Sequence, residues 1–144
     1  MDKILIVDDE KSVRMLISSL LKTEGDEVTE ATNEKEAVEI AKRENPHVIL
    51  MDVKMPVLDG IEACKKLKED EKTKHIPILA ITAFSMTKME IIEAGVDDFI
   101  VKPVDAEELS IRVRSMLKIR YLTDELQRVG LYVEELQKQR KKSS

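Results

Sequence analysis

Short runs of consecutive apolar residues recur along the chain, and they predict strands that are buried on both faces of a sheet. The runs stand at 4–7, 48–51 and 78–81, with a shorter one at 99–101. Residues 27–31 instead alternate polar and apolar side chains, which is typical of a strand at a sheet edge. The pattern therefore predicts five strands.

Between these runs, apolar residues recur at helical spacing and predict five helices. Helix starts are indicated by Asn or Asp followed by Glu three residues later, and helix ends by Gly. These signals stand at Asn33–Glu36, Asp105–Glu108, Gly25 and Gly95. Five alternating strand–helix pairs predict an α/β fold with a doubly wound parallel sheet. Its strand order should be the flavodoxin-like 2-1-3-4-5, with an additional C-terminal helix.

Composition narrows the class of protein. The 144 residues are 42% hydrophobic and 37% charged, which is typical of one globular domain. A net charge of -5 gives no reason to expect direct nucleic-acid binding, and the basic cluster at 138–142 is read as a solvated tail. Without a signal peptide or a run of about 20 apolar residues, we expect a cytoplasmic protein that does not enter membranes. The lone Cys64 excludes an internal disulfide.

Polar residues follow four of the predicted strands, at the point where each strand ends. They are Asp8 and Asp9, Asp52, Thr82, and Lys102. Any one of them could be a helix cap, a turn residue or a surface charge. However, the carboxyl ends of parallel strands meet at one edge of the sheet, where such folds place their sites. The presence of such residues at four strand ends together favours a functional site.

Electrostatics restricts what that site can be. Two carboxylates about 4 Å apart repel by roughly 4 kcal/mol at an effective dielectric constant near 20. Lys102 supplies one compensating charge, and Mg²⁺, which prefers oxygen ligands, would supply the rest. Zinc is disfavoured because neither histidine stands at a strand end. Beside a metal and an ammonium, Asp52 is suited to accept a phosphoryl group, and Asp8 and Asp9 are suited to hold the metal.

The same residues resemble the receiver domains of response regulators in two-component signalling. The resemblance covers residues 1 to 118 and lies in Ile4–Glu10, Met51–Pro56, Asp59–Gly60, Ile81–Ala83, Ala94–Gly95 and Asp97–Pro103. It implies that Asp52 takes a phosphoryl group from a histidine kinase or a phosphotransfer protein. It also implies that the protein is a phosphorylation-activated switch, not an enzyme, beyond its own Mg²⁺-dependent autophosphorylation and autodephosphorylation.

The resemblance also assigns the remaining roles. Mg²⁺ would be bound by Asp9, Asp52 and the backbone carbonyl of Lys54, with Asp8 acting through water. Lys102 would pair with the phosphoryl group, and the peptide bond between Lys102 and Pro103 is often cis in the family.

Thr82 and Phe99 resemble the switch pair of this family. The threonine hydroxyl moves onto the phosphoryl group, and the aromatic ring turns inward behind it. Two departures stand beside this pair. Thr82 and Phe99 are 17 positions apart, about two fewer than is commonest, which predicts a shortened start to the fourth helix. Phe84 stands where many relatives carry a polar residue that assists hydrolysis.

Two other functions share parts of this pattern. A receiver-like scaffold could act by partner contact without phosphate, but Asp9, Asp52, Thr82 and Lys102 are all present. A metal-dependent phosphohydrolase would usually need an aspartate two residues after the nucleophile, where this chain has Lys54.

Residues 119–144 form a separate predicted unit, an amphipathic helix. Its apolar residues follow heptad spacing: Ile119, Leu122, Leu126, Val129, Val133 and Leu136. A five-helix domain does not need this stripe for its core. The stripe predicts a coiled coil that joins two copies or leads to an output domain or effector protein. The alternative is that the helix folds back onto its own domain.

Overall fold

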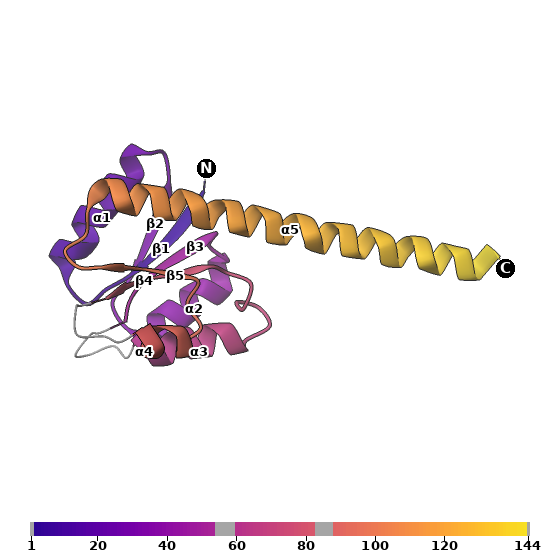
Figure 1. The fold of residues 1–144 in the computed structure, drawn as a ribbon, viewed down its shortest axis with the longest axis horizontal. Helices are drawn as coiled ribbons and strands as arrows, with labels where there is room; N and C mark the ends of the chain where they lie inside the picture. Colours follow the sequence, from indigo (N-terminus) through magenta and orange to yellow (C-terminus); the bar gives the residue numbers. More distant parts are fainter. Residues whose placement is uncertain (1, 54–59, 83–87, 144) are drawn as a thin grey trace.

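The computed structural model describes residues 2–53, 60–82 and 88–143 (Figure 1). Five parallel strands form one sheet in the order β2-β1-β3-β4-β5, so the predicted fold class and strand order are confirmed. The strands are β1 (Lys3–Val7), β2 (Glu27–Ala31), β3 (Val48–Asp52), β4 (Ile78–Thr82) and β5 (Asp98–Val101).

Helices cover both faces of this sheet (Figure 1). They are α1 (Lys11–Thr23), α2 (Glu34–Glu44), α3 (Gly60–Glu69), α4 (Lys88–Glu93) and α5 (Ala106–Ser143). Helices α1 and α5 pack on one face, and α2 and α3 pack on the other together with Ala94, the residue after α4. Each face has its own apolar core, because successive side chains of a strand point to opposite sides. Every residue of β3 and β4 is buried, as their continuous apolar runs predict.

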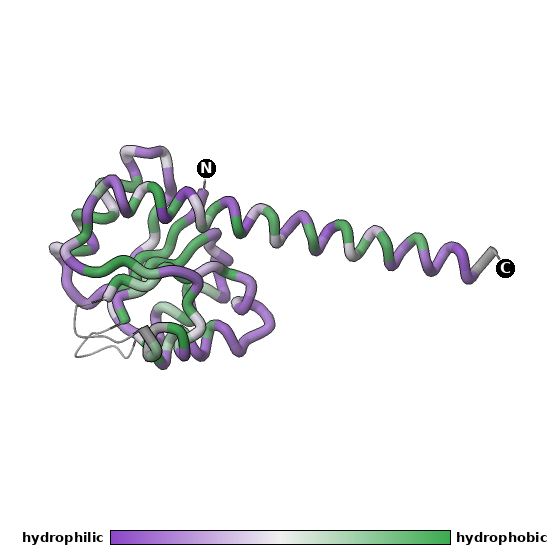
Figure 2. Tube along the Cα trace, viewed as in Figure 1, coloured by the Kyte–Doolittle hydropathy of each residue, from purple (hydrophilic) through white to green (hydrophobic). Residues whose placement is uncertain are grey.

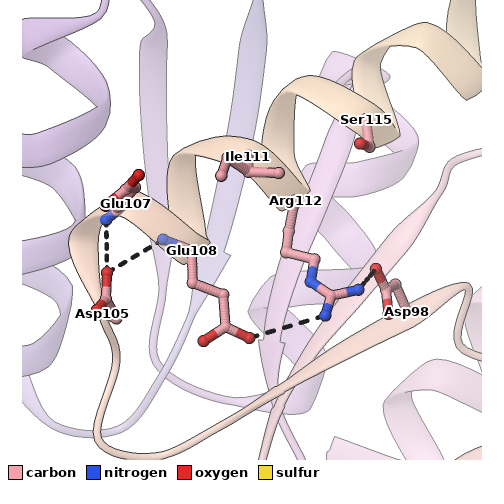
Figure 3. Close-up of a pocket in the computed structure, with 7 residues that line it drawn as sticks. All are labelled: Asp98, Asp105, Glu107, Glu108, Ile111, Arg112 and Ser115. Atoms are coloured by element: carbon pink, nitrogen blue, oxygen red, sulfur yellow. Dashed lines mark hydrogen bonds and ion pairs between the residues drawn. The ribbon is translucent and has the colours of Figure 1, made fainter.

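The predicted helix signals are present, with one variation. The Glu36 amide donates to the Asn33 side chain at 2.9 Å, as a capping box requires. The Glu36 carboxylate instead accepts from the backbone amide of Thr32. Asp105 caps α5 by accepting from the amides of Glu107 and Glu108 (Figure 3).

Helix α4 has six residues and is the shortest of the five described helices. The residues before it, 83–87, lie outside the described part of the chain. The shortened start of this helix therefore stays a prediction.

Helix α5 continues without interruption from the domain into the C-terminal extension, 38 residues in all. Arg120 anchors the transition: it is buried, and it donates to the carbonyl of Pro46 at 2.6 Å and to Asp124 at 3.2 Å. From Leu126 to Lys141 every side chain is exposed, and the helix projects away from the domain (Figure 1). The extension therefore does not fold back onto its own domain. None of the described helices combines the length and the apolar character that crossing a membrane requires.

Candidate functional site

The carboxyl ends of β1, β3, β4 and β5 bring the predicted polar residues to one edge of the sheet. Asp52 is the last residue of β3 and pairs in register with Ile81, one residue before Thr82. The amide of Lys102 donates to the carbonyl of Thr82 at 2.8 Å, which fixes the ends of β4 and β5 side by side. The parallel register thus assembles the site that the strand ends predict.

Three carboxylates cluster at this edge. Oxygen atoms of Asp8, Asp9 and Asp52 lie within 4.8 Å of one another. Asp8 and Asp52 are buried, and one oxygen of Asp8 has no hydrogen-bond partner among the described residues. A buried oxygen without a donor is costly unless a cation compensates it. The donor set consists of hard carboxylate oxygens, so these residues fit Mg²⁺.

Lys102 balances part of this negative charge. Its ammonium donates to Asp52 at 2.8 Å, across 50 positions of sequence. Burial acts to lower the pKa of Lys102, but the hydrogen bond and the charge of Asp52 outweigh burial and raise it. Lys102 therefore stays a cation at the side of Asp52. The Lys102–Pro103 peptide bond is cis, as the resemblance implies.

Asp8 is a member of the cluster whose charged form is disfavoured by its surroundings. Burial, together with the negative charges of Asp52 and Asp9, raises the pKa of Asp8 from 3.8 to about 6. The amide of Glu10, which donates to Asp8 at 2.9 Å, and the charge of Lys102 offset only part of this effect. Without a cation at the cluster, Asp8 therefore takes up a proton at a higher pH than an ordinary aspartate does.

The backbone at Asp52 is closely approached by the first residue of α3. A Cβ atom on Gly60 would lie 2.3 Å from the carbonyl oxygen of Asp52 and 2.4 Å from the Cα of Val53. Neither backbone atom can move away without disturbing β3. Only glycine fits at position 60, and its smallness lets α3 start directly against the site.

Thr82 and Phe99 lie on the same face of the sheet. Phe99 pairs in register with Ala80, and Thr82 pairs with Val101. Side chains two residues apart on a strand share a face, so the Phe99 ring stands diagonally from Thr82 across the small side chain of Ala80. Phe99 is half-buried, and Thr82 is buried. The two predicted switch residues are therefore neighbours on one surface of the sheet.

Arg14 is a residue of this region that the sequence pattern did not indicate. From the first turn of α1, one terminal guanidinium nitrogen donates to the backbone carbonyl of Asp8 at 2.8 Å. The Nε of the same side chain donates to the carboxylate of Glu30 in β2 at 3.2 Å. Arg14 thereby holds the turn that carries Asp8 and Asp9. In the sequence it reads only as a polar residue on an amphipathic helix.

Two residues with predicted roles, Lys54 and Phe84, lie outside the described part of the chain. The predicted Mg²⁺ ligand at the Lys54 carbonyl therefore stays a prediction. So does the expectation that the apolar Phe84 impedes the attacking water and slows hydrolysis of the phosphoryl group.

A surface pocket of about 440 Å³ lies between β5 and the first turns of α5 (Figure 3). Three of its charged residues pair: Arg112 binds Asp98 at 2.8 Å and approaches Glu108 at 3.8 Å. None of the carboxylates of the acidic cluster lines it. This pocket is a separate feature of the surface.

Comparison with known proteins agrees with the geometry of the acidic cluster. Residues 4–114 match the family model of the response regulator receiver domain. The chain belongs to this family. Among solved structures, the receiver domain of the sensor histidine kinase PA1611 from Pseudomonas aeruginosa is 30% identical, with a TM-score of 0.75; the match covers 81% of this chain and 98% of that one. That structure has a magnesium ion coordinated in its active-site cleft. A receiver domain from a histidine kinase of Syntrophus aciditrophicus is 31% identical, with a TM-score of 0.77, over 82% and 91% of the two chains.

Curated relatives contain this receiver domain within longer chains. The response regulator PleD of Caulobacter vibrioides is 40% identical over 126 residues, which are 86% of this chain and 28% of PleD. The transcriptional regulatory protein SrrA of Staphylococcus aureus is 40% identical over 119 residues, or 81% and 48% of the two chains. The chain thus spans less than half the length of these relatives.

Proposed function

We propose that this receiver domain is a phosphorylation-activated switch in which Asp52 accepts the phosphoryl group. The observation that carries the proposal is the environment of Asp52. Its buried carboxylate accepts from Lys102 at 2.8 Å and lies within 4.8 Å of carboxylate oxygens of Asp8 and Asp9. A nucleophile, a fixed cation and a set of metal-binding oxygens at one sheet edge are the parts that phosphoryl transfer requires.

In the proposed reaction, a carboxylate oxygen of Asp52 forms a bond to the phosphorus atom while the bond to the donor's leaving group breaks. The product is an aspartyl phosphate, which water later hydrolyses to inorganic phosphate and the free carboxylate. The ammonium of Lys102 would neutralise charge on the phosphoryl oxygens. Asp9, Asp52 and the backbone carbonyl of Lys54 would bind the metal, and Asp8 would act through water. When bound, Mg²⁺ supplies positive charge that offsets the charge of these oxygens.

In the same proposal, Thr82 and Phe99 convert phosphorylation of Asp52 into a change at the protein surface. The hydroxyl of Thr82 stands at the end of β4, beside the strand that ends in Asp52. Movement of this hydroxyl onto the phosphoryl group would vacate space on the sheet face that Phe99 shares. Inward rotation of the half-buried ring would then change the surface around β5. A local charge event would thereby become a change of shape at a distance.

The partners belong to the proposal as well. A histidine kinase or a phosphotransfer protein would supply the phosphoryl group, and an output domain or effector protein would respond to the switched state. Similarity to a segment of a histidine kinase from Formosa agariphila and to the response regulators above supports this assignment.

Mg²⁺-dependent labelling by a small phosphodonor tests the proposal. With acetyl phosphate and Mg²⁺, the intact mass should increase by one phosphoryl group, and with a chelator the increase should be absent. A scaffold that acts without phosphate would take up none in either condition. A phosphohydrolase would release phosphate continuously from a small phosphomonoester, which this chain is not expected to do.

Arg14 provides a second, more local prediction. Arg14→Ala removes the donor to the Asp8 carbonyl, so the turn with Asp8 and Asp9 should hold Mg²⁺ less well. We expect the Mg²⁺ concentration for half-maximal labelling to rise on the order of tenfold, the scale on which residues behind a metal site act. The labelling rate at saturating Mg²⁺ should change little. A loss of rate that excess Mg²⁺ does not restore would contradict this role, and Lys11→Ala, on the same turn of α1, is the control.

A further inference from the structure

Six apolar side chains on the projecting part of α5 are exposed. Figure 2 shows hydrophobic and hydrophilic segments alternating along this part of the helix. The exposed fractions of the six side chains run from 41% at Ile119 to 73% at Leu126. The other members are Leu122, Val129, Val133 and Leu136. Spacings of three and four residues place all six on one side of the helix, at the a and d positions of a heptad repeat. We call these six residues the seam.

The seam faces a different direction from the side of α5 that packs on the sheet. That side is formed by Val113, Met116 and Arg120, all buried. At about 100° of rotation per residue, the seam lies roughly a third of a turn around the helix from this side. Arg120 fixes the helix to the carbonyl of Pro46 at the point where the seam begins. The domain therefore holds the seam outward and leaves space for another helix beside it.

We propose that the seam binds the seam of a second copy of this chain in a parallel, two-stranded coiled coil. Parallel dimers are favoured by β-branched residues at a and leucine at d. Here the a positions are Ile119, Leu126 and Val133, and the d positions are Leu122, Val129 and Leu136. Each set follows the preference at two of its three positions.

The residues beside the seam are compatible with this arrangement. In a parallel dimer, residue g of one helix faces residue e of the next heptad in its partner. The facing pairs are Lys118 with Thr123, Glu125 with Gly130, and Tyr132 with Gln137. No pair brings like charges together. A lipid surface fits less well, because Asp124, Glu125, Glu134 and Glu135 lie within the apolar segment.

The basic end of the helix also favours the parallel orientation. An antiparallel alignment that matches every apolar layer sets Ile119 against the partner's Leu136. It would lay residues 138–142 of each chain cation against cation along the partner's Lys118, and beside Arg112 and Arg114, which already pair with Asp98 and Asp26. In the parallel dimer these residues lie at the outer ends of the helices, where salt screens their repulsion.

Association through this short seam should be measurable but modest. The seam spans fewer than three full heptads, which is short for a coiled coil, and Gly130 weakens the helix. No atom lies within 4 Å of a Cβ placed on Gly130, so alanine fits there. The free helix frays toward its end, whereas the coiled coil requires it to be ordered, so the higher helix propensity of alanine in both copies should make Gly130→Ala tighten the dimer roughly tenfold.

Light scattering and sedimentation over a range of concentrations test the seam. The full chain should change from monomer to dimer as its concentration rises. Leu126→Asp, which places a charge in the seam, should remain monomeric, whereas the control Gln127→Asp, one residue along and facing outward, should dimerise normally. Phosphorylation is not required, so Asp52→Asn should dimerise like the unaltered chain. A monomer at every concentration, or equal behaviour of Leu126→Asp and Gln127→Asp, would overturn the proposal.

Cysteine cross-linking tests the orientation, on a Cys64→Ala background that removes the only native thiol. In the parallel dimer Leu136→Cys lies beside its own copy, so a disulfide should form roughly tenfold faster than with the outward-facing control Glu135→Cys. An equal mixture of Ile119→Cys and Leu136→Cys should give few mixed dimers. Cross-links that form chiefly in this mixture would show antiparallel helices and overturn the parallel dimer.

Discussion

Asp52→Asn is expected to abolish phosphoryl incorporation from acetyl phosphate, whatever the concentration of Mg²⁺. The side-chain amide has nearly the shape of the carboxylate but lacks the nucleophilic charge. It also removes a third of the negative charge of the acidic cluster, so Mg²⁺ should stabilise the variant less than the unaltered protein. Intact mass after incubation measures the first effect, and thermal melting with and without Mg²⁺ measures the second.

A matched control for this variant is Glu10→Gln. Glu10 is an exposed carboxylate on the turn that carries Asp8 and Asp9, and it is not a member of the cluster. Its variant should take up one phosphoryl group like the unaltered chain. Labelling that survives Asp52→Asn in a folded protein would show that another side chain is the acceptor.

The second large effect concerns stability and pH, and it arises from Asp8. Its pKa is about 6 in the folded protein, against an ordinary value of 3.8. Between these two values the folded state keeps a proton that the unfolded state releases, so stability falls as pH rises from about 4 to about 6 and stays lowered above that. At about 1.4 kcal/mol per unit of pKa, the loss is on the order of 3 kcal/mol.

Urea denaturation with a chelator present can isolate this loss. Asp8→Asn has no proton to lose, so its stability relative to the unaltered protein should rise by on the order of 3 kcal/mol over the same pH range. At neutral pH, Mg²⁺ should raise the stability of the unaltered protein more than that of the variant, because the ion compensates the buried negative charge of Asp8. If the two proteins keep a constant difference in stability across this range, the account of Asp8 is wrong.

The fold and most of the site were predictable because the information is local to each strand. A continuous apolar run specifies a strand buried on both faces, and alternation of strands and helices specifies a parallel sheet. A parallel sheet then brings the ends of β1, β3, β4 and β5 together. Asp52 and Lys102 could therefore be expected to meet although 50 positions separate them. The capping residue Asn33 was predictable for the same reason, because its partner lies three residues away.

Features that depend on three-dimensional packing were not predictable. The contact of Arg14 with the Asp8 carbonyl depends on how α1 leaves β1, and its contact with Glu30 depends on the neighbouring strand. Close approach of α3 to the backbone of Asp52 requires Gly60, which the sequence marks only as part of a motif. Apolar spacing predicted the seam but not its direction. Arg120 sets that direction through a carbonyl 74 positions away.

Locating the phosphoryl group within the chain tests the central claim most directly. An aspartyl phosphate is an acyl phosphate, which borohydride reduces to the alcohol, so digestion and peptide mass spectrometry after trapping identify the modified residue. The reduced residue should be found at Asp52, in samples that contained both acetyl phosphate and Mg²⁺ and not in those with a chelator. A trapped residue at any other position, or Mg²⁺-independent labelling, would contradict the account.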